Sequence, residues 1–290
     1  MIRAALLGLA AVAFAFAFAS CAEAKPPVWI VRDSDSEMLL FGSVHVLPPG
    51  LDWRPPELDA ALKVADDLWF ELPIEPAAEA ETGRLASERG VFGPGHSLSA
   101  LLTPEGGARL TRATERAGLS PAVIDGLEPW FAEVVLAGAE YRRQGAVASS
   151  GVEKAVAEAA PAAVARRAFE TPDQQIALFD QAPLADQVAS LEQTLEELES
   201  RPNAYADLVG DWMSADLPAL DRDVMAPLRT AAPGLYKRLV TDRNARWTVE
   251  LDKRLRGKGR TVVVVGVGHL IGPDGAPARL RALGYSVEGP

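Results

Sequence analysis

The apolar positions of the chain predict an α/β fold in which strands form at both ends and helices fill the middle. The four consecutive valines at 262–265 are too few for a helix and are typical of a strand buried on both faces. Short apolar runs at 28–32 and 37–41, separated by the polar residues 33–36, indicate a hairpin. We therefore expect a central sheet to which both ends of the chain contribute.

Between these ends the apolar pattern alternates strands with helices. Two prolines at 55–56 precede a segment at 57–65 with apolar residues at helical spacing, and the apolar run at 68–73 predicts a strand. The middle of the chain is rich in alanine and mostly helical in its periodicity. The other expected elements are helices within 75–144 and 184–257, a helix from 151 to about 161, a strand at 163–169, a helix at 273–283 and a last strand at 285–287.

The first 24 residues have the composition of an export signal. Arg3 precedes an apolar segment at 4–19, and residues 22–24 follow the small-x-small pattern of signal-peptidase sites. Cys21 ends a segment that resembles the lipobox of bacterial lipoproteins, although Phe18 stands where that pattern has leucine. We expect removal of residues 1–24 or, alternatively, a membrane tether through lipid on Cys21. Either outcome leaves 25–290 as one exported domain, periplasmic or associated with the outer membrane of a bacterium.

Composition narrows the chemistry that the exported domain can perform. The formal net charge of −11 disfavours nucleic acid or an anionic membrane surface as a partner. Cys21 is the only cysteine, so residues 25–290 offer no disulfide, thiolate nucleophile or cysteine-ligated zinc. The sequence contains no serine elbow, P-loop or complete dinucleotide fingerprint. Catalysis or metal binding would have to depend on histidines and carboxylates.

Two of the three histidines share a motif, Gly-x-x-His, at the end of an expected strand. Gly42 precedes His45 by three positions, and Gly266 precedes His269 in the same way. Chance would produce this pairing with a probability of roughly 0.02. Ligands gather beyond the carboxyl ends of strands in open α/β sheets, so both histidines are candidates for metal binding or catalysis. The alternative for each of them is a buried core imidazole whose ring nitrogens are satisfied by hydrogen bonds. The third histidine, His96, lies in a loop entering a helix, and we assign it no role.

Further candidates lie near other strand and helix ends. Glu71 ends an apolar strand, where it requires a cation, a metal or a hydrogen-bond donor unless it lies exposed on an edge strand. Glu170 ends a second strand. Arg243 and Asn244 belong to the helix start at 241–247, which combines cationic, amide and aromatic side chains. This combination suits binding of an anionic or carbonyl group, or simply caps a helix.

Seven segments occur together in the order found in the TraB/PrgY/GumN family, which the chain therefore resembles. This family, also called TraB/GumN, is related to the Tiki metalloproteases and to the erythromycin esterase and ChaN-like proteins. Glu153 stands where the family commonly has Asp, and Asp242 where it commonly has Glu. The matching segments are FGSVH at 41–45, WFELP at 69–73, LEPW at 127–130, GVEKAVAEAA at 151–160, FETPDQQ at 169–175, DRNARW at 242–247 and VVVGVGHLIGPDG at 263–275.

The resemblance implies an α/β core in which both Gly-x-x-His motifs and Glu71 converge. His45, Glu71 and His269 then become the metal-binding or catalytic set, with Arg243 and Asn244 orienting substrate or stabilising charge. Two imidazoles and one carboxylate leave a metal position open for water. Nitrogen and oxygen ligands suit a divalent ion such as Zn, Mn, Co or Fe.

The sequence leads us to expect an extracytoplasmic, metal-dependent hydrolase that acts on a peptide or small-molecule substrate and resembles a peptidase. Glu71 or Glu170 would serve as general base where it is not a ligand. One alternative is a metal-independent esterase in which an imidazole is the general base. The other is a non-catalytic protein that binds a peptide or haem, because a shared fold does not confer activity.

Overall fold

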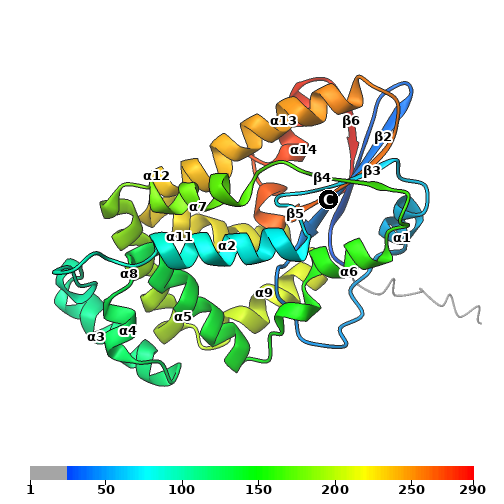
Figure 1. Cartoon of the computed structure of the whole chain (residues 1–290). Coiled ribbons are helices and arrows are strands. Elements are labelled where there is room, and N and C mark those ends of the chain that lie inside the picture. The colour runs from blue at the N-terminus through cyan, green and yellow to red at the C-terminus, as the bar shows by residue number, and fades with distance from the viewer. Residues whose placement is uncertain (1–24) are drawn as a thin grey trace, which may run out of the picture.

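The computed structural model describes residues 25–290, and its centre is a six-stranded mixed sheet (Figure 1). The strand order is β4-β3-β5-β2-β1-β6. Strands β2, β3, β4 and β5 are mutually parallel, whereas β1 is antiparallel to both of its neighbours. The expected α/β fold with a central sheet is confirmed. The strands are β1 Val28–Arg32, β2 Ser36–Ser43, β3 Asp67–Phe70, β4 Ala165–Ala168, β5 Gly259–Gly266 and β6 Ser286–Glu288.

Strand β5 lies at the centre of the parallel part of the sheet because its valine run can be buried on both faces. All four valines at 262–265 are buried, and Val264 lies opposite Phe41 of β2 and Phe70 of β3 in the register of the sheet. Since these three strands are parallel and in this register, their carboxyl ends lie side by side. Ligand sites of open α/β sheets form at this kind of edge.

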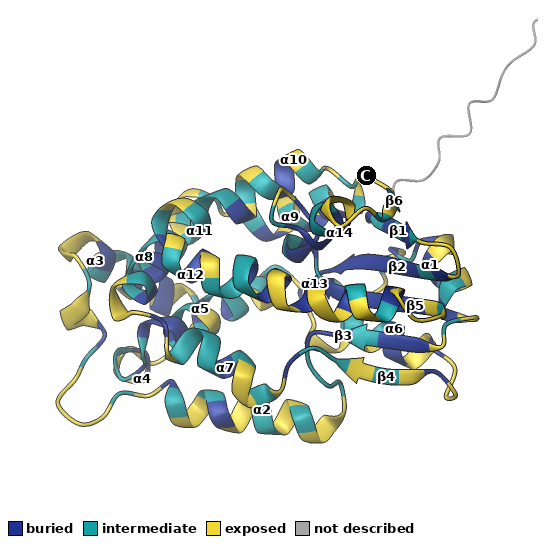
Figure 2. Cartoon of the chain, turned by 90° about the horizontal axis from the view of Figure 1, so that it is seen from above, coloured by how far each residue is buried: buried dark blue, intermediate teal, exposed yellow. Residues whose placement is uncertain are grey.

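The helices fall into two groups in space. Figures 1 and 2 show α1, α13 and α14 beside the sheet, whereas α3, α4, α5 and α8 gather beyond the carboxyl ends of the strands. The helices are α1 Pro56–Leu62, α2 Pro76–Arg89, α3 Pro104–Arg116, α4 Pro121–Asp125, α5 Pro129–Arg143, α6 Val152–Ala159, α7 Pro172–Asp180, α8 Leu184–Ser200, α9 Ala204–Met213, α10 Leu217–Leu220, α11 Ala226–Ala231, α12 Pro233–Tyr236, α13 Asp242–Leu255 and α14 Ala276–Ala282.

Each group of helices has its own apolar core. The larger core covers both faces of the sheet and includes Trp212 of α9 and Leu251 of α13. A second core joins α3, α5 and α8 through residues such as Leu110, Leu136 and Leu191. Helix α2 spans part of the distance between them, with Leu85 packed against Trp130 and Ile176 in a smaller cluster. A space lined by side chains of both groups can therefore form at the strand ends.

The expected elements are observed with shifted ends. Strand β1 has the predicted bounds, β2 extends past the predicted 37–41, and β4 is shorter than the predicted 163–169. The predicted helical section at 184–257 contains two π-helical turns, Asp221–Met225 and Lys237–Thr241, that periodicity did not reveal. Residues 1–24, which carry the expected export signal and Cys21, lie outside the described residues. Within residues 25–290, no helix combines the length and apolar character required to cross a membrane.

Candidate functional site

Three strand ends bring the candidate side chains to one edge of the sheet. Strand β3 leads directly into Glu71, and His45 follows two residues after the end of β2. Strand β5 ends at Gly266, which pairs with Ser43 of β2 and precedes the 3₁₀ turn Val267–His269. Because β2, β3 and β5 are parallel neighbours, the register of the sheet places these segments together.

Gly266 lies among the three side chains that the resemblance singled out. A Cβ atom added to Gly266 would lie 3.2 Å from Oε1 of Glu71, 3.6 Å from Nε2 of His45 and 3.8 Å from Cδ2 of His269. The structure therefore brings His45, Glu71 and His269 around one small space. The glycine keeps that space free of a side chain, which gives a physical reason for a glycine at this place.

The glycine of the first motif has a different role. A Cβ atom added to Gly42 would lie 2.8 Å from Cγ2 of Val267, closer than real contacts allow. The missing side chain lets the turn after β5 pack directly on β2. The two Gly-x-x-His motifs thus support each other, because Gly42 of the first permits the position of the turn that carries His269 of the second.

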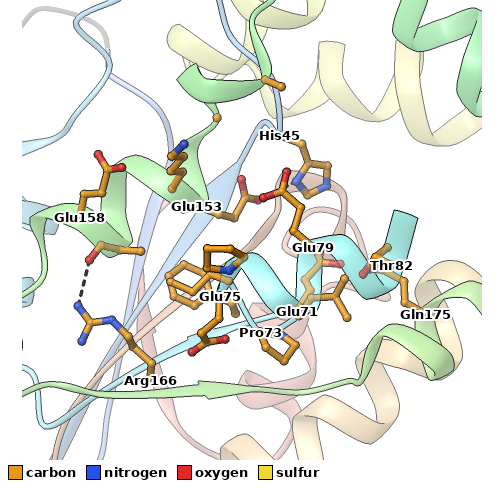
Figure 3. Close-up of a pocket in the computed structure, with 18 residues that line it drawn as sticks. His45, Glu71, Pro73, Glu75, Glu79, Thr82, Glu153, Glu158, Arg166 and Gln175 are labelled. Carbon is orange, nitrogen blue, oxygen red and sulfur yellow. Dashed lines mark hydrogen bonds and ion pairs between the residues drawn. The ribbon is translucent and has the colours of Figure 1, made fainter. Parts of the chain in front are cut away.

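His45 is held by a carboxylate and faces open space. Its Nδ1 lies 2.7 Å from Oε1 of Glu153, which also accepts a 2.5 Å hydrogen bond from the hydroxyl of Ser43. The negative charge of Glu153 is the largest cause that raises the pKa of His45, to about 9. Since 67% of the His45 side chain is exposed, solvent screens part of this attraction. With Nδ1 bound to Glu153, Nε2 is the ring nitrogen directed toward the space beside Gly266. The His45 side chain also lines a cavity (Figure 3).

Glu71 and Glu170 lie next to each other because the pairing of β3 with β4 continues past both strands. The backbone N–H of Glu170 donates to the carbonyl oxygen of Glu71 at 3.0 Å. A capping box formed by Thr171 and Gln174 then starts α7 and turns the chain away. Two buried carboxylates side by side require positive charge or hydrogen-bond donors.

Arg243 supplies that charge from the first turn of α13. Its Nη2 donates to Oε2 of Glu71 at 2.6 Å and to Oε2 of Glu170 at 2.9 Å, and its Nε donates to Oε1 of Glu170 at 2.9 Å. The guanidinium also lies 4.5 Å from the ring centroid of Trp247. Only 5% of Arg243 is exposed, so this ion cluster is inside the protein. The expectation that Glu71 needs a cation beside it is met by an arginine.

The environment of Glu71 keeps it ionised. Burial alone would raise its pKa, but the positive charges of its neighbours, Arg243 among them, lower it to about 2. Its second oxygen, Oε1, accepts a hydrogen bond of 2.7 Å from the backbone N–H of Gly266. Glu71 is therefore a carboxylate at any pH near neutrality, with Oε1 on the side of the shared space.

His269 is buried and both of its ring nitrogens have partners. Its Nδ1 lies 2.8 Å from Oδ1 of Asn244, and its Nε2 lies 2.9 Å from Nη1 of Arg243. A guanidinium can only donate, so Nε2 accepts and Nδ1 carries the proton. Burial is the main cause that lowers the pKa of His269 to about 3. Asn244 is fully buried and donates to the carbonyl oxygens of His269 and Asp274, so its contacts fix the turn that carries His269.

A metal ion held jointly by His45, Glu71 and His269 does not fit this arrangement. The lone pair of His269 Nε2 accepts a hydrogen bond from Arg243, so it is not available to a metal ion. The guanidinium of Arg243 already supplies the positive charge that balances Glu71 and Glu170. Across residues 25–290, no group of three or more His, Cys, Asp or Glu residues is arranged to hold a metal ion. The divalent metal stays a prediction, and no chemical step below depends on it.

Two cavities meet at His45 and Glu71. The first, the acidic cavity, has a volume of about 740 Å³ and is also lined by Glu75, Glu79 and Glu158 (Figure 3). The second, the apolar cavity, has a volume of about 470 Å³ and extends past Arg243 and His269 between apolar side chains of α2, α5, α7, α11 and the two π-helical turns. His45 and Glu71 line both cavities, so a ligand could pass from one to the other across them. The other residues shared by both linings are Thr82 and Gln175.

Sequence reasoning missed the partner of His45. Glu153 was noted only as a departure from the family pattern, yet it is the residue that orients His45. Its position in the first turn of a predicted helix, inside a family segment, is the signal that could have indicated a role. His96, which was given no role, lies in the loop after α2 and stacks on Phe92.

The fold and the site define an α/β protein in which two Gly-x-x-His turns and a buried carboxylate–arginine cluster share one sheet edge. The chain belongs to the TraB/PrgY/gumN family, whose model matches residues 27–289, nearly its whole length. The predicted family is thus confirmed. No curated protein and no solved structure matches the chain significantly.

Proposed function

We propose that this protein is a hydrolase of ester or amide bonds in which His45 is the general base and does not need a metal. The observation that carries the proposal is the pair formed by His45 and Glu153, with Nε2 of His45 facing the same space as Oε1 of Glu71. A base oriented by a carboxylate is a recurrent arrangement in hydrolases. This reaction corresponds to the metal-independent esterase, with an imidazole as general base, that the sequence offers as an alternative.

In the proposed reaction, Oε1 of Glu71 accepts a hydrogen bond from a water molecule and orients it. Nε2 of His45 takes a proton from that water as its oxygen attacks the carbonyl carbon of the substrate. Glu153 stabilises the imidazolium that forms, since its charge favours protonated His45. Nε2 then gives the proton to the leaving oxygen or nitrogen as the bond to the carbonyl carbon breaks.

The buried cluster behind these groups holds their positions. Arg243 fixes Glu71 through the hydrogen bond to Oε2. The other oxygen, Oε1, is then directed toward the space beside Gly266. His269 and Asn244 in turn hold Arg243 and the turn after β5. We assign Glu170 to the same cluster, because its contacts are with Arg243 and Trp247. Arg243, Asn244 and Glu170 are thus proposed as positioning residues.

The direct experiment is hydrolysis of p-nitrophenyl esters and amides by purified residues 25–290, compared with the His45→Gln variant. General base catalysis contributes about 10²- to 10⁴-fold, so the variant should lose activity by that order. A matched His96→Gln variant, in the exposed loop after α2, should keep full activity. Stoichiometric ligand capture without product, or unchanged turnover in His45→Gln, would contradict the proposal.

A metal-dependent, peptidase-like hydrolase is the second candidate. One observation favours it: metal-bound histidines commonly give their second ring nitrogen to a carboxylate, as His45 does with Glu153. This candidate requires Arg243 to release His269. Metal analysis of the purified protein, before and after the double substitution His45→Ala and His269→Ala, separates the two candidates, because only a metal enzyme should lose bound metal.

We further propose that the domain works outside the cytoplasm. The support is the export-signal pattern of residues 1–24 and the lipobox-like segment that ends in Cys21. Mass spectrometry of the full chain expressed in a bacterial host, with and without Cys21→Ser, tests this proposal. Cleavage near residue 24 or a lipid on Cys21 supports it, and an intact amino terminus in the cytoplasmic fraction contradicts it.

A further inference from the structure

The apolar cavity is lined almost entirely by hydrocarbon and aromatic side chains except where it meets the candidate site. Trp130 and Phe131 of α5, Phe179 of α7 and Leu239 supply large apolar surfaces, while Val134 stands half-exposed on α5. The polar members of the lining are the site residues Arg243 and His269, together with His45, Glu71, Thr82 and Gln175. A pocket of about 470 Å³ with apolar walls and a few polar groups at one end has the usual form of a ligand site.

Both π-helical turns found within residues 25–290 contribute to this cavity. The turn Asp221–Met225 presents Met225, and the turn Lys237–Thr241 presents Leu239 and Val240. A π turn is a rare interruption of a regular helix and is frequently found at functional sites. The two turns supply part of the apolar lining, and their presence in the wall of one cavity supports a role of that cavity in ligand binding.

The acidic cavity carries many more charged groups. Glu75, Glu79 and Glu158 line it in addition to Glu71 and Glu153, beside Lys154 and apolar residues such as Leu72 and Ile74 (Figure 3). Since Glu71 is the only carboxylate in the lining of the apolar cavity, a bulky uncharged group is better matched there. A ligand that crosses His45 and Glu71 has a defined direction, with its apolar end toward Trp130.

We infer that the apolar cavity is the specificity pocket of the proposed hydrolase and takes a bulky apolar group located directly beside the hydrolysed bond. This inference rests on the proposed function for the reaction, but the ligand chemistry comes from the cavity itself. An aromatic or branched side chain of a peptide and a medium-length acyl chain share that chemistry. Negatively charged groups next to the bond are disfavoured by the carboxylates of the acidic cavity.

Two substrate series test the inference and distinguish its two sources. The first consists of p-nitrophenyl esters from acetate to octanoate, and the second of N-acetyl-alanine, -leucine and -phenylalanine p-nitroanilides. Burial of a methylene is worth about 0.8 kcal/mol, so kcat/KM should rise about fourfold per added methylene until the cavity is full. An increase only in the ester series identifies acyl chains, and an increase only in the anilide series identifies peptides. No dependence on apolar size in either series would overturn the inference.

A matched pair of valine variants locates the effect. Val134 lines the apolar cavity and is 50% exposed, whereas Val123 of α4 is 62% exposed and lines neither cavity. Val134→Asp should reduce the preference for the longest ester at least fivefold, and Val123→Asp should leave it unchanged. Equal effects of the two substitutions would contradict the assignment of the cavity. Both sites are exposed, so folding should tolerate both changes.

A binding measurement keeps this inference separable from the proposed function. N-phenyl-1-naphthylamine, an apolar fluorescent probe, should bind residues 25–290 in a one-to-one ratio and bind at least fivefold more weakly to Val134→Asp than to Val123→Asp. Binding with this pattern but without any turnover would reject the hydrolase and retain the apolar ligand site. Turnover with no selective probe binding would reject the ligand site and retain the hydrolase.

Discussion

Arg243 donates a hydrogen bond of 2.9 Å to Nε2 of His269, and this contact fixes which ring nitrogen of His269 carries the proton. The imidazole must accept at Nε2, so its proton lies on Nδ1 and is bound by Asn244. The same guanidinium binds Glu71 and Glu170. A single arginine thus links the end of β5 to the ends of β3 and β4.

Removal of Arg243 should be strongly destabilising. Arg243→Met leaves two buried carboxylates without their cation, and breaking a buried ion pair in this way costs about 3–5 kcal/mol. Urea denaturation of residues 25–290 measures the loss. The control is Arg84→Met, because Arg84 pairs with Glu81 and Glu88 on the exposed surface of α2, where solvent screening makes the loss of stability much smaller. Similar losses in both variants would show that the cluster is not a structural centre.

Stability should fall as the solution becomes acidic, because of His269. Its pKa is lowered from 6.5 to about 3 in the folded protein, so below pH 6.5 the unfolded chain binds a proton that the folded chain rejects. Stability is therefore fully present above pH 6.5 and is lost as the pH falls toward 3. The expected slope is about 1.4 kcal/mol per pH unit for this one proton. Urea titrations from pH 7 to pH 4 should give a slope in the wild type that exceeds the slope in His269→Gln by about this amount, a comparison that cancels opposing groups such as Glu133, whose pKa burial raises to about 7.

Gly266→Ala should impair activity without unfolding the protein. The backbone of Gly266 has φ −49° and ψ 134°, which an alanine can adopt. The new methyl group would lie 3.2 Å from Oε1 of Glu71 and would fill the space that these side chains surround. We expect kcat/KM to fall more than about tenfold, since misplacement of a reacting group by 1 Å can cost about 100-fold.

Gly107→Ala is the control for this prediction, because a Cβ atom at Gly107 in α3 meets no atom within 4 Å. Activity of this variant should be unchanged and its stability equal or slightly higher. If Gly266→Ala kept full activity, the space at the end of β5 would not be where the substrate reacts.

Much of the sheet could be predicted from the sequence because its signals are local. The valine run of β5 and the polar turn between β1 and β2 mark those strands directly. The convergence of His45, Glu71 and His269 was expected only through family resemblance, since the pairing of β2, β3 and β5 joins segments about 200 residues apart.

The hydrogen bonds that orient each site residue and set its protonation could not be predicted from the sequence. Glu153 and His45 are 108 residues apart, and Arg243 and Glu170 are 73 apart. These contacts depend on how helices α6 and α13 pack against the sheet, which periodicity does not determine. The π turns were missed for a similar reason: a helix with one inserted residue keeps its composition while the hydrogen bonding changes.

Removal of metal should leave activity intact if His45 works alone. Dialysis of residues 25–290 against a strong chelator should not change kcat/KM for p-nitrophenyl butyrate, and elemental analysis should find less than stoichiometric metal. The reason is that Arg243 already occupies the lone pair of His269. Activity that disappears with chelation and returns with one divalent ion would instead support the metal-dependent hydrolase.

In the proposed hydrolase Glu153 tunes His45 as the base, and the pH dependence of kcat/KM in wild type and Glu153→Gln measures this effect. The base must be unprotonated, so wild-type activity should rise with pH and level off near the pKa of His45, about 9. Loss of the Glu153 charge should move that limb down toward 6.5, with a lower plateau. A limb that stays at the same pH in Glu153→Gln would show that Glu153 does not act on the catalytic base.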